Sequence, residues 1–156
     1  MSTKDATKAE LERRQFGCFL NMISAGHAPS DIKSREVPEP DICFQNRIAF
    51  ELTEICSPEV AHTNAKLPST GGVKLIYPTD TAADQLTEKL NKNYVSTLPI
   101  ELLCIGTLRT MWTDDHVIGE MRRVLSSHQK VQFRRIWYCG DGTVEVIHNP
   151  ENLTEL

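Results

Sequence analysis

The sequence lacks the features of a membrane, secreted or disulfide-stabilised protein. It contains no run of 18 or more apolar residues, so no segment is expected to span a bilayer. Its first six residues hold no apolar stretch of the kind found in secretory signals, which favours a cytoplasmic protein. The five cysteines, an odd number at wide spacing, predict reduced and buried thiols: Cys18, Cys43, Cys56, Cys104 and Cys139.

Several motifs of common enzyme classes are also missing. No C-x-x-C or H-x-x-x-H spacing supports a zinc site. Gly71-Gly72 is not followed by the GK[ST] of a phosphate-binding loop. Neither Ser57 nor Ser69 lies in a G-x-S-x-G sequence. The sequence therefore gives no support for a zinc site, a phosphate-binding loop or a nucleophile elbow.

The composition is that of an ordinary globular domain. The chain has 156 residues, of which 40% are hydrophobic and 24% charged, so we expect one domain over residues 1–156 with its core within about 8–148. The net charge of −4 does not favour nucleic-acid binding. A local basic patch on an acidic protein would still be sufficient for it.

The most informative stretch, residues 40–55, predicts two short strands joined by a tight turn. Side chains alternate between the two faces of a strand, so Ile42 and Phe44 share one face and Asp41 lies on the other. In the second strand Phe50 belongs to the apolar face and Glu51 to the opposite face.

Placing both apolar faces in the same core selects the length of the turn. A two-residue turn would put the apolar sets on opposite faces, whereas a three-residue turn, residues 45–47, pairs Ile42 with Phe50 and Asp41 with Glu51. That turn needs a positive φ at Asn46 or Arg47. Two adjacent carboxylates repel each other, so the pair suggests a bound cation or a raised pKa on one acid. The alternative is that this face is simply solvated.

This stretch resembles the PD-(D/E)xK nuclease-like superfamily. Pro40 and Asp41 match its Pro-Asp, and Glu51 matches the acid of its Glu-x-Lys. Thr53 stands where that family has lysine, which puts catalysis in doubt. The resemblance implies a restriction endonuclease-like αβββαβ core within an α/β (α+β) fold, a mixed central sheet flanked by helices.

The resemblance also implies a chemistry. Asp41 and Glu51, together with the backbone carbonyl of Leu52, would bind Mg²⁺ or Mn²⁺ for hydrolysis of DNA phosphodiester bonds. In some divergent members the following helix supplies the missing lysine. Lys89 is the best-placed replacement here, followed by Lys92, although both fit an ordinary helix surface equally well.

Further charged residues are weaker candidates. The resemblance implies that Glu12, at the edge of the apolar stripe of the first helix, could approach the acid pair and that Glu36 could be an outer carboxylate; both also fit a solvated position. Arg122-Arg123 and Arg134-Arg135 are expected to be peripheral. The charges available to face DNA are Lys33, Arg35, Lys66, Lys74, Lys89 and Lys92.

Periodicity and turn residues predict the remaining elements. Helices are expected over residues 7–25, ending at Gly26, and at about 79–94 and 117–127. Residues 28–39 are expected to be a connection, 60–79 a loop, and residues from 149 a loosely held tail. Besides the hairpin, strands are expected over 73–77 (a short one), 100–106, 133–139 and 143–148.

Two functions follow, from different classes. The first is a metal-dependent nuclease-like enzyme acting on DNA, supported by Asp41 and Glu51. The second is a non-catalytic module of the same fold that binds a nucleic acid, a protein or a second copy of itself as a homodimer. Thr53 in the lysine position and the acidic net charge favour the second.

Overall fold

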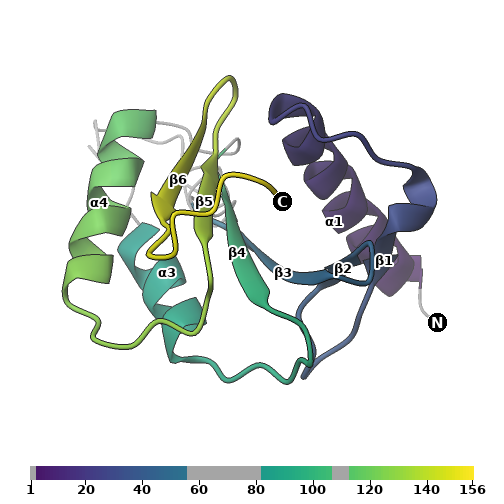
Figure 1. Ribbon diagram of the computed structural model, residues 1–156, viewed down its shortest axis with the longest axis horizontal. Helices are drawn as coiled ribbons and strands as arrows, with labels where there is room; N and C mark the ends of the chain where they lie inside the picture. The colour runs from purple at the N-terminus through teal and green to yellow at the C-terminus, as the bar shows by residue number, and fades with distance from the viewer. Residues whose placement is uncertain (1–2, 56–81, 107–112) are drawn as a thin grey trace, which may run out of the picture.

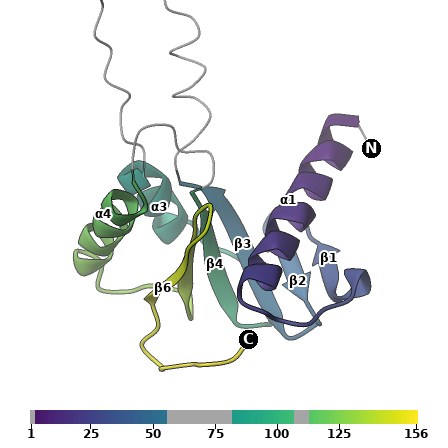
Figure 2. The same cartoon turned by 90° about the horizontal axis from the view of Figure 1, so that it is seen from above.

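The described part of the protein is built on a mixed β-sheet with helices on both of its faces (Figures 1 and 2). The computed structural model describes residues 3–55, 82–106 and 113–156. Helix α1 covers one face of the sheet, and helices α3 and α4 lie together on the other. The helices in these residues are α1 (Thr3–Met22), a 3-10 turn η1 (Pro29–Asp31), α3 (Ala82–Asn91) and α4 (Asp114–Ser126).

The described residues form six strands, which lie in the sheet in the order in which they occur along the chain. They are β1 (Ile32–Ser34), β2 (Ile42–Phe44), β3 (Ile48–Glu54), β4 (Ile100–Ile105), β5 (Ile136–Cys139) and β6 (Val144–His148). The pairs β1–β2, β2–β3 and β5–β6 are antiparallel, whereas β3–β4 and β4–β5 are parallel. Parallel neighbours need crossover connections, and α3 and α4 lie in these connections. The mixed sheet flanked by helices is therefore confirmed.

Each face of the sheet has its own hydrophobic core. On the α1 face, the ring of Phe16 lies 4.7 Å from that of Phe50, and Phe19 packs edge-on against Trp137 at 5.1 Å. On the other face, Leu86 of α3 and Met121 of α4 are fully buried with Leu102 of β4. The nearly continuous apolar sequence of β4 is explained by its central position, covered on both faces.

The β2–β3 hairpin has the predicted register. Ile42 pairs with Phe50, and Phe44 pairs with Ile48. Asn46 has a φ of 54°, as the three-residue turn requires, and Gln45 also has a positive φ, of 52°. The requirement that both apolar faces enter one core therefore predicts the pairing correctly.

The predicted end of the first helix is wrong. Helix α1 ends at Met22, and Ser24 is the residue with a left-handed backbone, at φ 57°. The N–H of Ser24 donates to Asn21 O and that of Ala25 to Leu20 O, which is the Schellman pattern. Gly26 lies beyond this cap. Because serine occupies the cap position that usually holds glycine, the sequence did not indicate where the helix ends.

The connection predicted over residues 28–39 contains an unexpected strand. β1 pairs with β2 through Ile32 and Phe44 and forms one edge of the sheet. Ile32 is its single apolar residue, so its sequence carries no strand pattern. The other short strand, predicted over 73–77, and the loop predicted over 60–79 lie outside the described residues.

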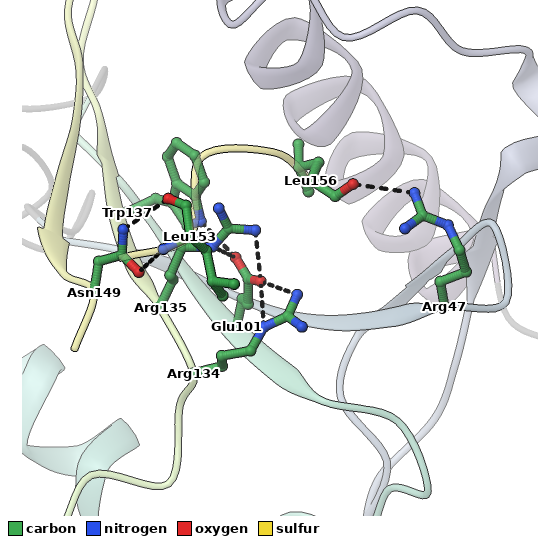
Figure 3. Close-up of polar contacts among 8 residues, drawn as sticks. All are labelled: Arg47, Glu101, Arg134, Arg135, Trp137, Asn149, Leu153 and Leu156. Atoms are coloured by element: carbon green, nitrogen blue, oxygen red, sulfur yellow. Dashed lines mark hydrogen bonds and ion pairs between the residues drawn. The ribbon is translucent and has the colours of Figure 1, made fainter. Parts of the chain in front are cut away.

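Later elements differ from the predictions mainly at their ends. Helix α3 ends at Asn91 rather than near Tyr94, and α4 begins at Asp114, three residues earlier than predicted. The residues after β6 are held against the body of the protein, not loosely as predicted. Asn149 Nδ2 donates to Leu153 O, and Arg47 donates to Leu156 O (Figure 3). Leu156 also packs against the α1-side core.

The cysteines agree with the prediction except at one position. Cys43, Cys104 and Cys139 are buried free thiols, whereas Cys18 on α1 is free but exposed. Burial raises the pKa of the Cys104 thiol above its usual range. Cys56 lies outside the described residues.

Candidate active site

A cleft of about 440 Å³ lies where β3 ends and β2 begins. One wall comes from the first half of α1 and includes Glu12, and the opposite wall comes from α3 and includes Lys89. Residues 37–39 and Tyr94 also contribute to its lining. A hydrogen bond of 3.0 Å from Val95 N–H to Pro38 O ties these last two segments together.

The predicted acid pair lies in this cleft. The register that pairs Ile42 with Phe50 brings Asp41 next to Glu51. The N–H of Asp41 donates to Glu51 Oε1 at 3.1 Å, and the N–H of Leu52 donates to Asp41 Oδ2 at 3.0 Å. Glu51 is only 3% exposed, so the alternative of a solvated face is wrong for this acid. The two carboxylates are held by backbone hydrogen bonds of the hairpin itself.

Lys89 reaches Glu51 from helix α3. Its Nζ lies 2.8 Å from Glu51 Oε2, and its side chain is 16% exposed. Leu86 and Leu90 bury the adjacent side of α3 and so direct Lys89 toward β3. The placement of a lysine at the acid pair is therefore confirmed, although Thr53 occupies the expected position in β3. Lys92 lines the same cleft and lies over the ring of Tyr94, 5.9 Å from its centre.

A tyrosine that was not predicted completes the contacts of Glu51. The hydroxyl of Tyr94 donates to Glu51 Oε2 at 2.9 Å. Burial and the charge of Glu51 raise the pKa of Tyr94 above its usual range, so it is a neutral donor at physiological pH. The sequence places Tyr94 at the end of a helix predicted to be longer, which concealed its role. The signal that could have revealed it is the break in apolar spacing after Leu90.

The two acids have different electrostatic environments. Burial and the charge of Glu51 raise the pKa of Asp41 to about 7. Burial acts on Glu51 in the same direction, but the hydrogen bond and charge of Lys89, with hydrogen bonds from Asp41 and Tyr94, lower its pKa below the usual range. Lys89 therefore neutralises Glu51, and the negative charge of Asp41 is left without a comparable partner.

Glu12 is the third acid of the group. It forms a side-chain hydrogen bond with Asp41, and burial raises its pKa above the usual range. Its predicted approach to the acid pair is confirmed, and the alternative of a simply solvated position is wrong. Glu36 is exposed and does not line the cleft, which agrees with the alternative of a solvated loop charge; Glu39, three residues later, lines the cleft.

Thr53 and Leu52 also take part in the cleft lining. Thr53 lies on the same face of β3 as Glu51, is 7% exposed and lines the cleft with its neighbours. The N–H of Leu52 points toward Asp41. In an extended strand the carbonyl of a residue points to the same edge as its N–H, so the Leu52 carbonyl is also directed to the Asp41 side.

The other basic residues are distributed differently from the prediction. Lys33 and Arg35 are exposed at β1, where Lys33 contacts Asn46, and neither lines the cleft. Lys8 of α1 lines it instead. Lys66 and Lys74 lie outside the described residues. Arg122 and Arg123 are exposed on α4, as predicted; Arg122 pairs with Glu145 of β6 and Arg123 with Glu120 of α4.

The prediction that Arg134 and Arg135 are peripheral is wrong. Both bind Glu101, which is fully buried on β4, with N–O distances of 2.6 and 2.8 Å (Figure 3). Trp137 Nε1 donates to the same carboxylate at 2.7 Å, and Arg135 lies over the Trp137 ring at 5.0 Å. Glu101 pairs with Phe50 in the sheet and so shares the α1 face, opposite to that of Glu51. This cluster is structural and separate from the cleft.

The donor set at Asp41 and Glu51 suits a hard cation held largely by water. Among the described residues, no three His, Cys, Asp or Glu side chains converge as a metal-binding group. Mg²⁺ commonly uses one or two carboxylates and keeps several waters, in contrast to zinc. The raised pKa of Asp41 indicates negative charge that a cation would offset. Two carboxylates and one carbonyl therefore fit Mg²⁺ or Mn²⁺ better than a metal that needs an all-protein cage.

Comparisons with known proteins give no relative for this chain: no family model, curated protein or solved structure matches it. Within the described ranges, no helix is both long and apolar enough to cross a membrane.

Proposed function

We propose that this protein is a metal-dependent nuclease-like enzyme of the PD-(D/E)xK type that hydrolyses phosphodiester bonds of DNA. The observation that carries the proposal is the contact of Lys89 with Glu51, because it supplies a lysine at an acid pair whose own strand lacks one. The order from α1 to β4, read as helix, three strands, helix and strand, supports the resemblance.

The residues of the cleft would have different roles in the reaction. Asp41, Glu51 and the carbonyl of Leu52 would hold Mg²⁺ or Mn²⁺. The metal would polarise a phosphate oxygen and lower the pKa of a bound water. Lys89 would orient the attacking water and offset the charge that builds up on the phosphate oxygens. Thr53 can donate one hydrogen bond to a phosphate oxygen, but it carries no charge.

The test is cleavage of linear, nicked and single-stranded DNA with Mg²⁺ or Mn²⁺. We expect Glu51→Gln and Lys89→Met each to reduce the rate by at least about 100-fold, in the range typical of lost charge stabilisation. Lys33→Met, on the exposed β1, is the matched control and should retain the wild-type rate. Cleavage that persists in Glu51→Gln would show that the activity comes from a contaminant or another site.

A second candidate is a non-catalytic binding module. The cleft lining contains six carboxylates and three lysines, and one of those lysines is already paired with Glu51. This excess of negative charge disfavours the binding of a polyanion such as DNA when no metal ion is present. Metal binding without cleavage of any nucleic acid would favour this candidate, with a protein or nucleic acid as the partner.

A further inference from the structure

Glu51 has two kinds of partner on the same oxygen. Oε2 accepts from the charged Lys89 at 2.8 Å and from the neutral Tyr94 at 2.9 Å, whereas Oε1 accepts from the N–H of Asp41 at 3.1 Å. Both contacts of Oε2 therefore come from side chains, whereas Oε1 is held by the backbone N–H of Asp41, on the side where a cation shared with Asp41 would bind.

The two partners of Oε2 respond differently to a cation. A divalent ion between Asp41 and Glu51 repels the ammonium of Lys89 at short range and reduces the charge that attracts it. The neutral phenol of Tyr94 is not repelled by the divalent ion. The position of the Tyr94 ring is also restrained, because it packs on the ring of Phe133 with the ring centres 5.8 Å apart. Within the described residues, Lys89 Nζ forms its one side-chain hydrogen bond with Glu51, and its side chain is long and flexible.

We infer that Tyr94 is the positioning residue of the acid pair, holding Glu51 in place while Lys89 leaves it for the reacting phosphate when a divalent cation binds. This inference rests on the proposed function and deepens it. Lys89 acts as a resident cation in the free protein and is exchanged for the metal. Tyr94 keeps Oε1 directed toward Asp41 in both states.

The inference requires metal affinity to change in opposite directions in two variants. Lys89→Met removes a competing cation, so Mn²⁺ should bind more tightly by at least about threefold. Tyr94→Phe removes a hydrogen bond that orients a ligand, so Mn²⁺ should bind about tenfold more weakly. Calorimetric titration measures both effects without any need for activity.

Matched controls separate these effects from general ones. Tyr138→Phe removes a different tyrosine hydroxyl, which bonds to Asp114 at 2.5 Å, and should leave the Mn²⁺ affinity unchanged. Lys92→Met removes a cleft lysine that lies over Tyr94, and should tighten binding less than Lys89→Met does. Circular dichroism and thermal unfolding in EDTA establish that each variant is folded.

A spectroscopic measurement follows the lysine directly. The lysine ¹³Cε signal that disappears in Lys89→Met belongs to Lys89, and we expect Mg²⁺ to move it toward the position of a free lysine. If the wild type binds metal and this signal does not move, Lys89 remains on Glu51 and the inference is wrong. The same conclusion follows if Tyr94→Phe and Tyr138→Phe bind Mn²⁺ with equal affinity, or if Lys89→Met does not tighten binding. Absence of metal binding by the wild type would instead contradict the proposed function, and the inference with it.

Discussion

Asp41 is the residue whose ionisation should most affect stability. Its pKa of about 7 in the folded protein exceeds the value of about 4 for an unfolded chain. The folded state therefore binds more protons than the unfolded state between these values, and stability falls as the pH rises through that window. This behaviour follows from the burial of a carboxylate beside Glu51.

We therefore predict that the difference in stability between wild type and Asp41→Asn changes with pH. Measured in EDTA by urea unfolding, wild type should lose more than about 1 kcal/mol relative to Asp41→Asn between pH 5 and pH 8, because one pKa unit corresponds to about 1.4 kcal/mol. Glu51, whose lowered pKa acts in the opposite direction at lower pH, is present in both proteins. Parallel pH profiles for the two proteins would contradict the assignment.

Glu101 is the residue on which the α1-side charge cluster depends. Its carboxylate is fully buried and accepts from Arg134, Arg135 and Trp137. Replacing one partner of a buried ion pair leaves the others uncompensated in the interior.

Glu101→Gln should lower the free energy of unfolding by about 3–5 kcal/mol. Glu120→Gln, which breaks the exposed pair with Arg123 on α4, is the control and should change it by less than about 0.5 kcal/mol. Equal effects of the two substitutions in urea unfolding would show that the buried cluster is not a major determinant of stability.

At the scale of elements, the strength of the local pattern decides what the sequence predicts. The β2–β3 hairpin was predictable because Ile42, Phe44 and Phe50 admit a single register if one core takes them all. The resemblance implied a lysine on the following helix, and the spacing beside Leu86 and Leu90 made Lys89 the best-placed one on α3. Each of these inferences uses several residues with a common period.

The structural features that the sequence did not predict depend on contacts between residues far apart in the chain. β1 contains one buried residue, and its pairing with β2 supplies what its sequence does not show. Arg134 and Arg135 resemble a solvated doublet until β5 is placed beside β4 and its Glu101. Tyr94 acquires its role through a bond to a residue 43 positions earlier in the chain. No local spacing encodes such partners.

The end of α1 offers a prediction about an element boundary. Ser24 adopts a left-handed φ of 57°, a conformation that costs serine more than glycine. Ser24→Gly should therefore raise the free energy of unfolding by about 0.5–1 kcal/mol.

Gly26 provides the comparison for this boundary. A methyl group at Gly26 would meet no atom within 4 Å, so Gly26→Ala should not destabilise the protein. Thermal unfolding compares the two variants. A loss of stability in Gly26→Ala together with no gain in Ser24→Gly would place the helix cap at Gly26 after all.

At the scale of the whole molecule, charge would govern the approach of the proposed DNA substrate. The net charge is −4, and carboxylates outnumber lysines in the cleft lining. DNA should therefore associate only when a divalent cation offsets this charge.

We predict that fluorescence anisotropy shows DNA binding with Ca²⁺ or Mg²⁺ and at least about tenfold weaker binding in EDTA at equal ionic strength. Asp41→Asn should largely lose the dependence on the divalent cation. Equal affinity in EDTA would indicate a basic surface elsewhere and would favour the non-catalytic module.

The central claim, that Asp41 and Glu51 form a metal site, is tested most directly by Mn²⁺ calorimetry on wild type and Glu51→Gln at pH 7.5. We predict saturable binding by the wild type at millimolar Mn²⁺ or below, and its loss in Glu51→Gln. Binding of equal affinity in both proteins would place the metal elsewhere. No binding to the wild type at millimolar Mn²⁺ would contradict the account, and the acid pair would then be a structural feature of the hairpin neutralised by Lys89.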